Sequence, residues 1–384
     1  MIDRICLIVN YNLYESKRVF AADFAAALQR HGVEVLIVDV MNKGFGADEA
    51  HQIIDFGPEL LASFNSFVPD ASGRYLWDYL RIPTLSILVD PAIYATGMPP
   101  SPDLLVSCVD RTDKEWLQEQ GYEPVFFLPH GVAIDDLPPQ KKIYDVVLTG
   151  TCYDYESLQK HWEANLPTHF HRILEQAAEQ VLAPGCISLL EALTQALKLD
   201  GIETTENEFY TLFTYLDYYT RGIDRVQLVR SLPNTSIHIF GELGTDHPSA
   251  KKGWDYYLKG MPHVTIHPSL NFEEALLIQK KSKICLNSMP FFKDGSHERI
   301  LTALAADAVP LTSETKWVRE EFIDNEELLI YCPGNYQNLE KRIQDLLAHE
   351  DKRSKIAQKG KDKVALRHTW DSRAKELIAQ LSDL

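Results

Sequence analysis

The sequence predicts an α/β protein in which two doubly wound, Rossmann-like domains face a central cleft. The first observation is a strand, a helix and a second strand at the start of the chain. Residues 4–9 and 33–40 are apolar and β-branched, and the segment between them is amphipathic. The second observation is that the alternation starts again near residue 144, after a polar segment at 133–142 with two adjacent prolines. Together these patterns predict two parallel sheets joined by a linker.

The first half of the chain carries signals for one complete domain. One helix is expected to close at Arg30, and two more are expected at residues 75–81 and 113–121. The remaining expected strands are residues 83–90, 104–109 and 124–129, with another that ends at 62–65. We therefore place an N-terminal Rossmann-like domain at residues 1–136.

The second half repeats the alternation around a long helical segment. Residues from about 154 to 223 lack strand signals and predict a helical insertion, whose aromatic stripe is most simply explained by core packing. The expected strands are residues 144–150, 236–240, 264–267, 283–287, 309–312 and 327–331. A second Rossmann-like domain is thus predicted at residues 137–365, followed at 366–384 by a C-terminal helix able to pack back on the first domain.

Charge and cysteine usage exclude several classes of protein. A formal net charge of -17 argues against nucleic-acid partners and against electrostatic attachment to anionic membranes. The six cysteines are scattered without CxxC pairs or metal-ligand spacing, which predicts free thiols in a reducing compartment and no metal site. The sequence shows neither a signal peptide nor a transmembrane run. We therefore expect a cytoplasmic protein without a transmembrane segment.

The segment from Asn287 to Thr312 is the most informative part of the chain. It predicts a strand end, a glycine- and serine-containing loop, a helix and another strand. A helix start presents free N–H groups and a partial positive charge, which suit a phosphate. The expected ligands of a nucleoside diphosphate in this segment are Asn287, Asp294, Ser296, His297, Glu298 and Arg299. Glu298 could instead point away or accept a ribose hydroxyl.

Three further positions are expected to converge on the same cleft. Gly150 and Gly241 each follow a buried strand, where a missing Cβ lets a ligand approach the backbone, and Thr151 adds a hydroxyl. The alternative is a simple tight exit from each strand. Arg225 follows the helical insertion and is expected at a helix start as a phosphate ligand, or alternatively in a surface ion pair.

Asp90 and His130 are the candidate catalytic residues. Asp90 ends an N-terminal strand and could take a proton from an acceptor hydroxyl, although a turn aspartate before Pro91 explains it as well. His130 lies at the domain junction, where it could touch a donor sugar or could be satisfied by the backbone.

Eight segments carry a family resemblance, namely residues 83–91, 128–131, 144–150, 284–287, 294–299, 302–305, 350–353 and 368–373. On these segments nearly the whole chain resembles the CgeB-like family of GT-B glycosyltransferases. The family resemblance implies a GT-B fold, a nucleotide-sugar donor (UDP-, GDP- or dTDP-sugar) on the C-terminal domain, an acceptor on the N-terminal domain and no obligatory metal cofactor. Among the positions named above, Thr151, Gly241, Ser296, His297 and Arg299 match those expected to bind the donor.

Two positions depart from the pattern of related GT-B enzymes. Thr302 stands where an acidic residue often holds the donor ribose, and Asp307 stands where glycine is usual. The leading hypothesis is a glycosyltransferase with a protein or glycan acceptor that the helical insertion recognises. The alternatives are a non-catalytic binding or scaffold protein with a GT-B body and, less favoured, a nucleotide-sugar epimerase.

Overall fold

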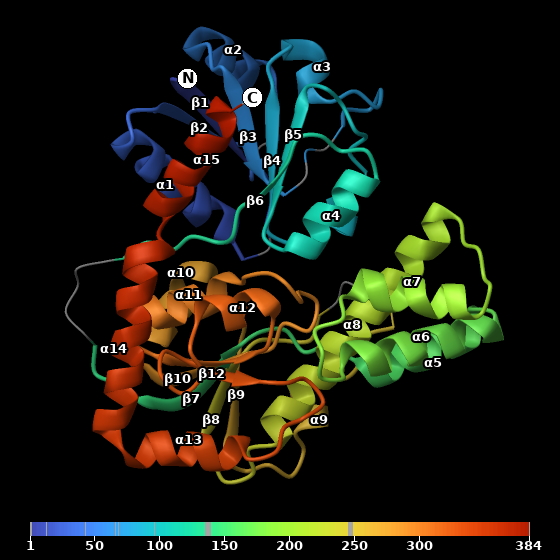
Figure 1. Ribbon diagram of the computed structural model, residues 1–384, viewed down its shortest axis with the longest axis vertical. Helices are drawn as coiled ribbons and strands as arrows, with labels where there is room; N and C mark the ends of the chain where they lie inside the picture. Colours follow the sequence, from blue (N-terminus) through green and yellow to red (C-terminus); the bar gives the residue numbers. More distant parts are fainter. Residues whose placement is uncertain are drawn as a thin grey trace.

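The computed structural model has two lobes, each built on a six-stranded parallel sheet (Figure 1). It describes residues 2–12, 14–42, 44–65, 67, 69–95, 97–134, 140–244 and 249–383. The expected boundary at 136/137 and the paired prolines of the expected linker lie outside the described residues. The predicted α/β architecture of two parallel sheets is confirmed.

The N-lobe sheet has the strand order β2-β1-β3-β4-β5-β6. Its strands are β1 Arg4–Val9, β2 Glu34–Asp39, β3 Leu60–Phe64, β4 Thr84–Leu88, β5 Leu104–Cys108 and β6 Val125–Phe127. Its helices are α1 Ser16–Arg30, α2 Ala47–Phe56, α3 Leu76–Leu80, the 3-10 helix η1 Ala92–Ala95 and α4 Arg111–Glu119. Alternate side chains of β1 enter two cores: Ile5 and Leu7 face α1, whereas Cys6 and Ile8 join the core of α2, α3 and α4.

The C-lobe sheet has the order β12-β11-β10-β7-β8-β9. Its strands are β7 Tyr144–Thr149, β8 Ile237–Phe240, β9 Val264–His267, β10 Ser282–Asn287, β11 Val309–Ser313 and β12 Leu329–Tyr331. Its helices are α9 Trp254–Tyr257, α10 Phe272–Lys280, α11 Glu298–Ala305, α12 Lys316–Glu321, α13 Leu339–Ala348 and α14 Glu350–Arg367. In both sheets the strand order reverses beside the first strand, and ligands of open α/β sheets bind at such a point.

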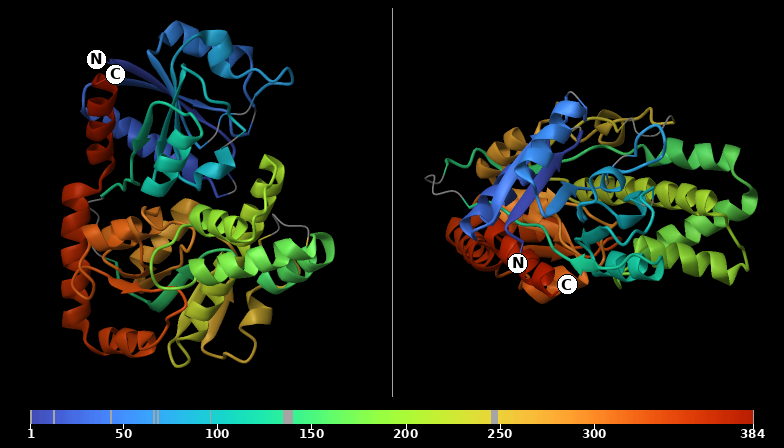
Figure 2. Two further views of the ribbon diagram at one scale, coloured as in Figure 1. Left: turned by 45° about the vertical axis from the view of Figure 1, so that its right-hand side comes forward. Right: turned by 90° about the horizontal axis from the view of Figure 1, so that it is seen from above.

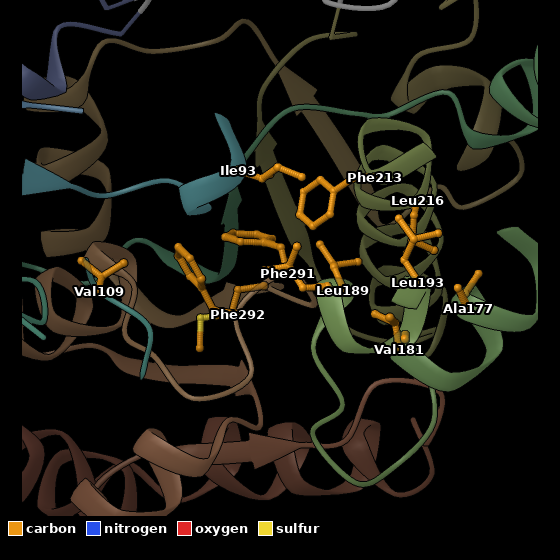
Figure 3. Close-up of a cluster of buried hydrophobic side chains, with 14 of the residues drawn as sticks. Ile93, Val109, Ala177, Val181, Leu189, Leu193, Phe213, Leu216, Phe291 and Phe292 are labelled. Atoms are coloured by element: carbon orange, nitrogen blue, oxygen red, sulfur yellow. The ribbon is translucent and has the colours of Figure 1, made fainter. Parts of the chain in front are cut away.

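The predicted helical insertion projects from the C-lobe as an arm (Figure 2). It contains α5 Tyr155–Asn165, α6 Thr168–Val181, α7 Leu189–Leu199 and α8 Glu206–Arg230. One apolar core joins this arm to both lobes, as Figure 3 shows for Ile93 of η1, Phe213 of α8 and Phe291 of the loop before α11. The arm is therefore packed at its base between the lobes.

Helix α8 is longer than the sequence indicated. It continues without a break from the arm into the C-lobe, so Arg225 lies inside a helix and not at a helix start. Val226 and Val229 on this last part of α8 pack in the core of the C-lobe sheet, which explains why the helix does not stop at the edge of the arm.

The chain returns to the N-lobe at its C-terminal end. Helix α15, Trp370–Ser382, packs against α1, and both described ends of the chain lie in the same lobe (Figure 1). The ring of Trp370 contacts Phe20, Phe24 and Phe64 at centroid distances of 5.7, 5.6 and 5.9 Å. Residues from opposite ends of the sequence therefore complete one face of the N-lobe core.

Candidate active site

A cleft of about 250 Å³ lies between the carboxyl ends of the two sheets. The N-lobe contributes the β1–α1 loop and the ends of β3 and β4, and the C-lobe contributes the ends of β7 and β8, helix α8 and the start of α11. The predicted site residues that line this cleft are Asp90, His130, Gly150, Thr151, Arg225, Gly241, His297, Glu298 and Arg299.

The structure does not bring the other three predicted residues to the cleft wall. Asn287 is buried beneath it and donates from Nδ2 to Thr312 Oγ1 at 2.9 Å on the neighbouring strand. Asp294 points to the N-lobe, where its carboxylate lies 3.3 Å from Arg111 Nη1. Ser296 is fully buried behind His130.

Two arginines flank Gly150 at the end of β7. A Cβ on Gly150 would lie 3.6 Å from Arg225 Nη1 and 3.7 Å from Arg299 Nη1. Arg225 Nη1 donates to Thr151 O at 2.7 Å, and Arg299 Nη1 donates to Thr149 O at 3.3 Å. The main chain on either side of Gly150 thus holds both guanidinium groups next to a position that has no side chain.

The positive charge of this pair is only partly compensated. Within the described chain Arg225 forms no ion pair, and its buried Nε has no hydrogen-bond partner. Burial, with Arg299 and Arg221 nearby, lowers the pKa of Arg225 to about 10 against the opposing influence of Tyr153. Burial also lowers the pKa of Arg299, although Glu298 opposes that shift. An anion between the two arginines would relieve both the desolvation and the mutual repulsion.

Arg221 is a cleft residue that the sequence analysis missed. It lies one turn before Arg225 on α8 and pairs with Asp217, with an Nε–Oδ1 distance of 2.6 Å. Its guanidinium stacks 3.7 Å from the centre of the Phe291 ring, and Asp217 also accepts a hydrogen bond from Tyr94 of the N-lobe. The sequence feature that could have indicated Arg221 is the i, i+4 spacing of Asp217, Arg221 and Arg225 on α8.

The start of α11 joins an imidazole and a carboxylate. His297 precedes the helix, and its Nδ1 lies 2.6 Å from Glu298 Oε2, closer than the 3.3 Å to the Arg299 amide nitrogen. Its Nε2 accepts from Arg299 Nη2 at 2.9 Å, so the proton belongs on Nδ1. Burial and the adjacent Arg299 lower the pKa of His297 to about 4 against the pull of Glu298, which keeps the ring neutral at pH 7.

The N-lobe wall carries polar side chains that are partly or fully exposed, unlike the buried Arg221 and Arg225 of the C-lobe wall. Asp90 is exposed in the cleft and accepts a hydrogen bond from Asn65 Nδ2 at 2.8 Å. Asn65 is itself fixed by the Val89 amide, which donates to Asn65 Oδ1 at 2.9 Å. Asn65, Asn12 and Lys17 line the cleft and were not singled out from the sequence, because single polar residues after strands are common in loops.

The β1–α1 loop bridges the two lobes at one edge of the cleft. The Phe272 amide donates to Tyr14 O at 2.9 Å, and the Tyr14 hydroxyl lies 3.4 Å from Thr151 Oγ1. The Phe20 and Phe272 rings pack edge to face behind this contact. The described structure therefore has the two walls in contact here.

Thr302 and Asp307, the two departures from the family pattern, are both accounted for locally. Thr302 is buried in α11 and donates from its hydroxyl to Glu298 O at 3.0 Å, so it does not line the cleft. Asp307 adopts a left-handed backbone with a φ of 54° and pairs with Lys361 at 2.9 Å. Left-handed geometry explains why glycine is usual at such a position.

Comparison with known proteins identifies the class of fold. Residues 224–379 match the model of a family described as glycosyl transferase-like, whereas none of the curated proteins searched matches the chain. The sucrose-phosphate synthase (tll1590) from Thermosynechococcus elongatus aligns over 99% of this chain and 98% of its own, with a TM-score of 0.56 and 12% identity. A glycosyltransferase from Rickettsia africae ESF-5 aligns over 99% and 98%, with a TM-score of 0.55 and 10% identity.

A third structure is that of Alr3699/HepE from Anabaena in complex with UDP-glucose. It aligns over 99% of this chain and 100% of its own, with a TM-score of 0.51 and 10% identity. The whole chain therefore has the GT-B fold, and its C-terminal part is glycosyl transferase-like in sequence. The described residues contain no helix able to cross a membrane and no group of three or more side chains suited to a metal ion.

Proposed function

We propose that this protein is a CgeB-like glycosyltransferase that moves a hexosyl group from a nucleoside-diphosphate sugar to a hydroxyl of a protein or glycan acceptor. The observation that carries the proposal is the arginine pair around Gly150. The two guanidinium groups lie close together, and buried Arg225 has no ion pair and an Nε without a partner in the described chain, which favours an anionic ligand between them. A diphosphate matches this requirement in charge and in its number of hydrogen-bond acceptors.

The proposed chemistry needs no metal ion. The bond between the anomeric carbon and the diphosphate breaks, a bond to the acceptor oxygen forms, and the nucleoside diphosphate leaves. Arg225 and Arg299 stabilise the charge that develops on the leaving group, and Asp90 on the opposite wall takes the proton of the acceptor hydroxyl. The six free cysteines support a reducing, cytoplasmic site of action.

The role proposed for the helical arm changes with the structure. Its last helix, α8, supplies Arg221 and Arg225 to the cleft, so the base of the arm belongs to the proposed donor site. Acceptor recognition is better assigned to the N-lobe wall, where Asn12, Asn65 and Asp90 offer donors and acceptors for hydroxyl groups.

One observation favours a second candidate function. The Thr302 hydroxyl donates within its own helix, and the residue supplies no carboxylate for a ribose. Loss of this carboxylate is compatible with a GT-B protein that has become a non-catalytic scaffold. Such a protein could bind a nucleotide but would not turn over its sugar.

Binding of a donor panel tests the proposal. UDP-, GDP-, dTDP- and CMP-sugars should be compared by thermal shift and calorimetry, starting with UDP-glucose because the Anabaena neighbour is described with it. A donor that binds the folded state raises the melting temperature by mass action. Binding followed by sugar transfer, detected as a mass increase of an acceptor, supports the glycosyltransferase. Binding without transfer or hydrolysis supports the scaffold, and no binding to a folded protein overturns the proposal.

A further inference from the structure

The N-lobe wall of the cleft carries a half-buried cation, Lys17, in the first turn of α1. Its Nζ donates to Tyr11 O at 3.3 Å, and none of the ion pairs of the described chain includes it. An ammonium group has three donors, so this long hydrogen bond leaves most of its capacity unused. The next residue, Arg18, lies outside the cleft lining and is paired with Asp39 at 2.7 Å and with Glu15 at 3.1 Å.

The charge of Lys17 is not neutralised by the wall on which it lies. Burial lowers the pKa of Lys17, and Asp90 opposes this shift. Asp90 does not form an ion pair with Lys17, however, and its carboxylate accepts a hydrogen bond from Asn65 Nδ2 at 2.8 Å. A charged group that loses water without gaining a counter-ion is unfavourable, so an anion from a ligand would stabilise Lys17.

The arginines of the opposite wall do not account for Lys17. Arg225 and Arg299 flank Gly150, where the diphosphate is proposed to bind, and Arg299 contributes to the lowered pKa of Arg225. Neither arginine contributes to the pKa shift of Lys17, whereas Asp90 does. The ammonium group therefore lies on the Asp90 side of the cleft, beside the proposed base.

The chemistry of the acceptor decides whether Lys17 gains a partner. A neutral acceptor with its hydroxyl at Asp90 would leave the ammonium group without a counter-ion. A carboxylate or a phosphate on the acceptor would pair with Lys17, and the lysine would offset the repulsion between that anion and Asp90. A compact ammonium group suits either anion, because it lacks the fixed fork geometry of a guanidinium.

We infer that the acceptor carries an anionic group, a carboxylate or a phosphate, and that Lys17 binds this group while the acceptor hydroxyl meets Asp90. This inference rests on the proposed function and adds the chemical class of the acceptor. The donor diphosphate is the alternative source of an anion, because the Tyr14 hydroxyl before α1 lies 3.4 Å from Thr151 Oγ1 on the donor side. Two experiments separate these sources.

Affinity for the nucleoside diphosphate alone gives the first test. Lys17→Met keeps the aliphatic stem and removes the charge. By calorimetry it should bind the nucleoside diphosphate of the donor that the panel identifies as the wild type does, whereas Arg225→Ala should bind it more weakly. Lys160→Met, at an exposed position of α5, is the control. A loss in Lys17→Met as large as that in Arg225→Ala assigns the lysine to the donor and overturns the inference.

Matched acceptors give the second test. Hexoses are offered as the neutral sugar, the 6-phosphate and the uronate at saturating donor, and transfer is followed as a mass increase. In the wild type the KM of the anionic forms should lie about tenfold to a hundredfold below that of the neutral form. Lys17→Met should remove this difference, and Lys17→Arg should retain part of it. Equal KM values, or no use of any anionic sugar by the wild type, overturn the inference.

A role of Lys17 through the base alone has a different signature. Lys17→Met would then lower kcat equally for neutral and anionic sugars and leave the ratio of their KM values unchanged, which also overturns the inference.

The failures of the two proposals differ. Absence of any donor binding to the wild type overturns the proposed function and the anionic acceptor together. Normal donor binding and sugar transfer without a preference for anionic acceptors overturns the anionic acceptor alone and leaves the glycosyltransferase standing.

Discussion

Both walls of the cleft lie at the carboxyl ends of parallel strands, but their side chains differ in charge and in burial. At the end of β7 the C-lobe holds buried charged groups, and each arginine is fixed by a main-chain carbonyl beside Gly150. At the ends of β3 and β4 the N-lobe presents Asn65 and the exposed carboxylate of Asp90. The comparison indicates that the fold holds the arginines of the C-lobe wall in place before a ligand binds. The side chains of the N-lobe wall are less constrained and could contact ligands of more than one shape.

Desolvation explains the difference. A buried guanidinium without a carboxylate loses hydration that only a bound anion restores, so the C-lobe residues must be held in place by the fold. Polar groups at the N-lobe wall remain in contact with water and need no such support. Variants on the two walls should therefore separate catalysis from donor binding.

The largest effect is expected at the N-lobe wall. Asp90→Asn should lower kcat by about a hundredfold to ten-thousandfold, the usual contribution of a general base. The donor Kd should stay unchanged, because Asp90 lies on the wall opposite the arginines. Steady-state kinetics and calorimetry measure the two quantities. Asp48→Asn, on the exposed start of α2, is the control, and full activity of Asp90→Asn returns this residue to a structural role.

Loss of a C-lobe arginine should give the next largest effect. Arg225→Ala and Arg299→Ala should each weaken nucleoside-diphosphate binding by about 1–3 kcal/mol, the range for a hydrogen bond to a charged group. Calorimetry with the nucleoside diphosphate alone measures the loss. Arg172→Ala on the exposed part of the arm should bind normally, since Arg172 pairs only with Asp200 in the described chain. Unchanged affinity in both cleft variants would remove Gly150 from the donor site.

Alanine substitutions at the two cleft glycines should affect different properties, the stability of the fold at Gly241 and donor affinity at Gly150. A Cβ on Gly241 would lie 2.0 Å from Gly150 O, so Gly241→Ala should destabilise the fold by about 1–3 kcal/mol through overpacking. A Cβ on Gly150 meets its neighbours only at 3.6 Å or more, so Gly150→Ala should fold normally and lose donor affinity by occupying ligand space. Urea denaturation and calorimetry on both variants provide the comparison. Normal donor binding by Gly150→Ala contradicts the proposed approach of the diphosphate.

The last expected effect concerns pH and involves both walls. His130 and His297 have pKa values of about 4 in the folded protein, below the ordinary value near 6.5 in an unfolded chain. The unfolded state therefore binds more protons in this window, and stability should fall on acidification from pH 6.5 toward 4 by about 1.4 kcal/mol per pH unit for each histidine.

Denaturation curves at pH 7 and pH 5 measure this slope. Asp23 acts in the opposite direction, because burial raises its pKa to about 6 and its folded form gains stability as the pH falls. The double variant His130→Gln/His297→Gln should show a shallower dependence than the wild type, while His51→Gln on exposed helix α2 should not. Identical slopes in all three proteins contradict the neutral, buried state of the two rings.

Much of the fold was accessible from local sequence patterns. Each buried parallel strand is a short apolar run, and the glycines after β7 and β8 mark strand ends without reference to any distant residue. The same reasoning found Gly150, Gly241 and the start of α11, which line the cleft.

The remaining site residues depend on contacts between distant parts of the chain. Asp294 was expected at the cleft because it lies in a polar loop, but buried Asp110 accepts from the Lys293 and Asp294 amides at 3.0 and 2.9 Å and turns this loop to the N-lobe. Arg221 was not singled out from the sequence, because its spacing from Asp217 is that of an ordinary helical ion pair, and only the tertiary packing of α8 brings it to the cleft. The spacing of residues within one helix or loop cannot indicate contacts between distant parts of the chain.

The return of α15 to the N-lobe has a consequence for how the protein is made. The strands of the N-lobe leave the ribosome first, yet the apolar surface formed by Phe20, Phe24 and Phe64 stays partly uncovered until Trp370 has been synthesised. The C-lobe sheet is complete in sequence before that point. Although domains generally fold in the order of their synthesis, here the lobe that is translated first is finished last, and a nascent chain stalled before residue 370 would expose an aromatic surface that chaperones recognise.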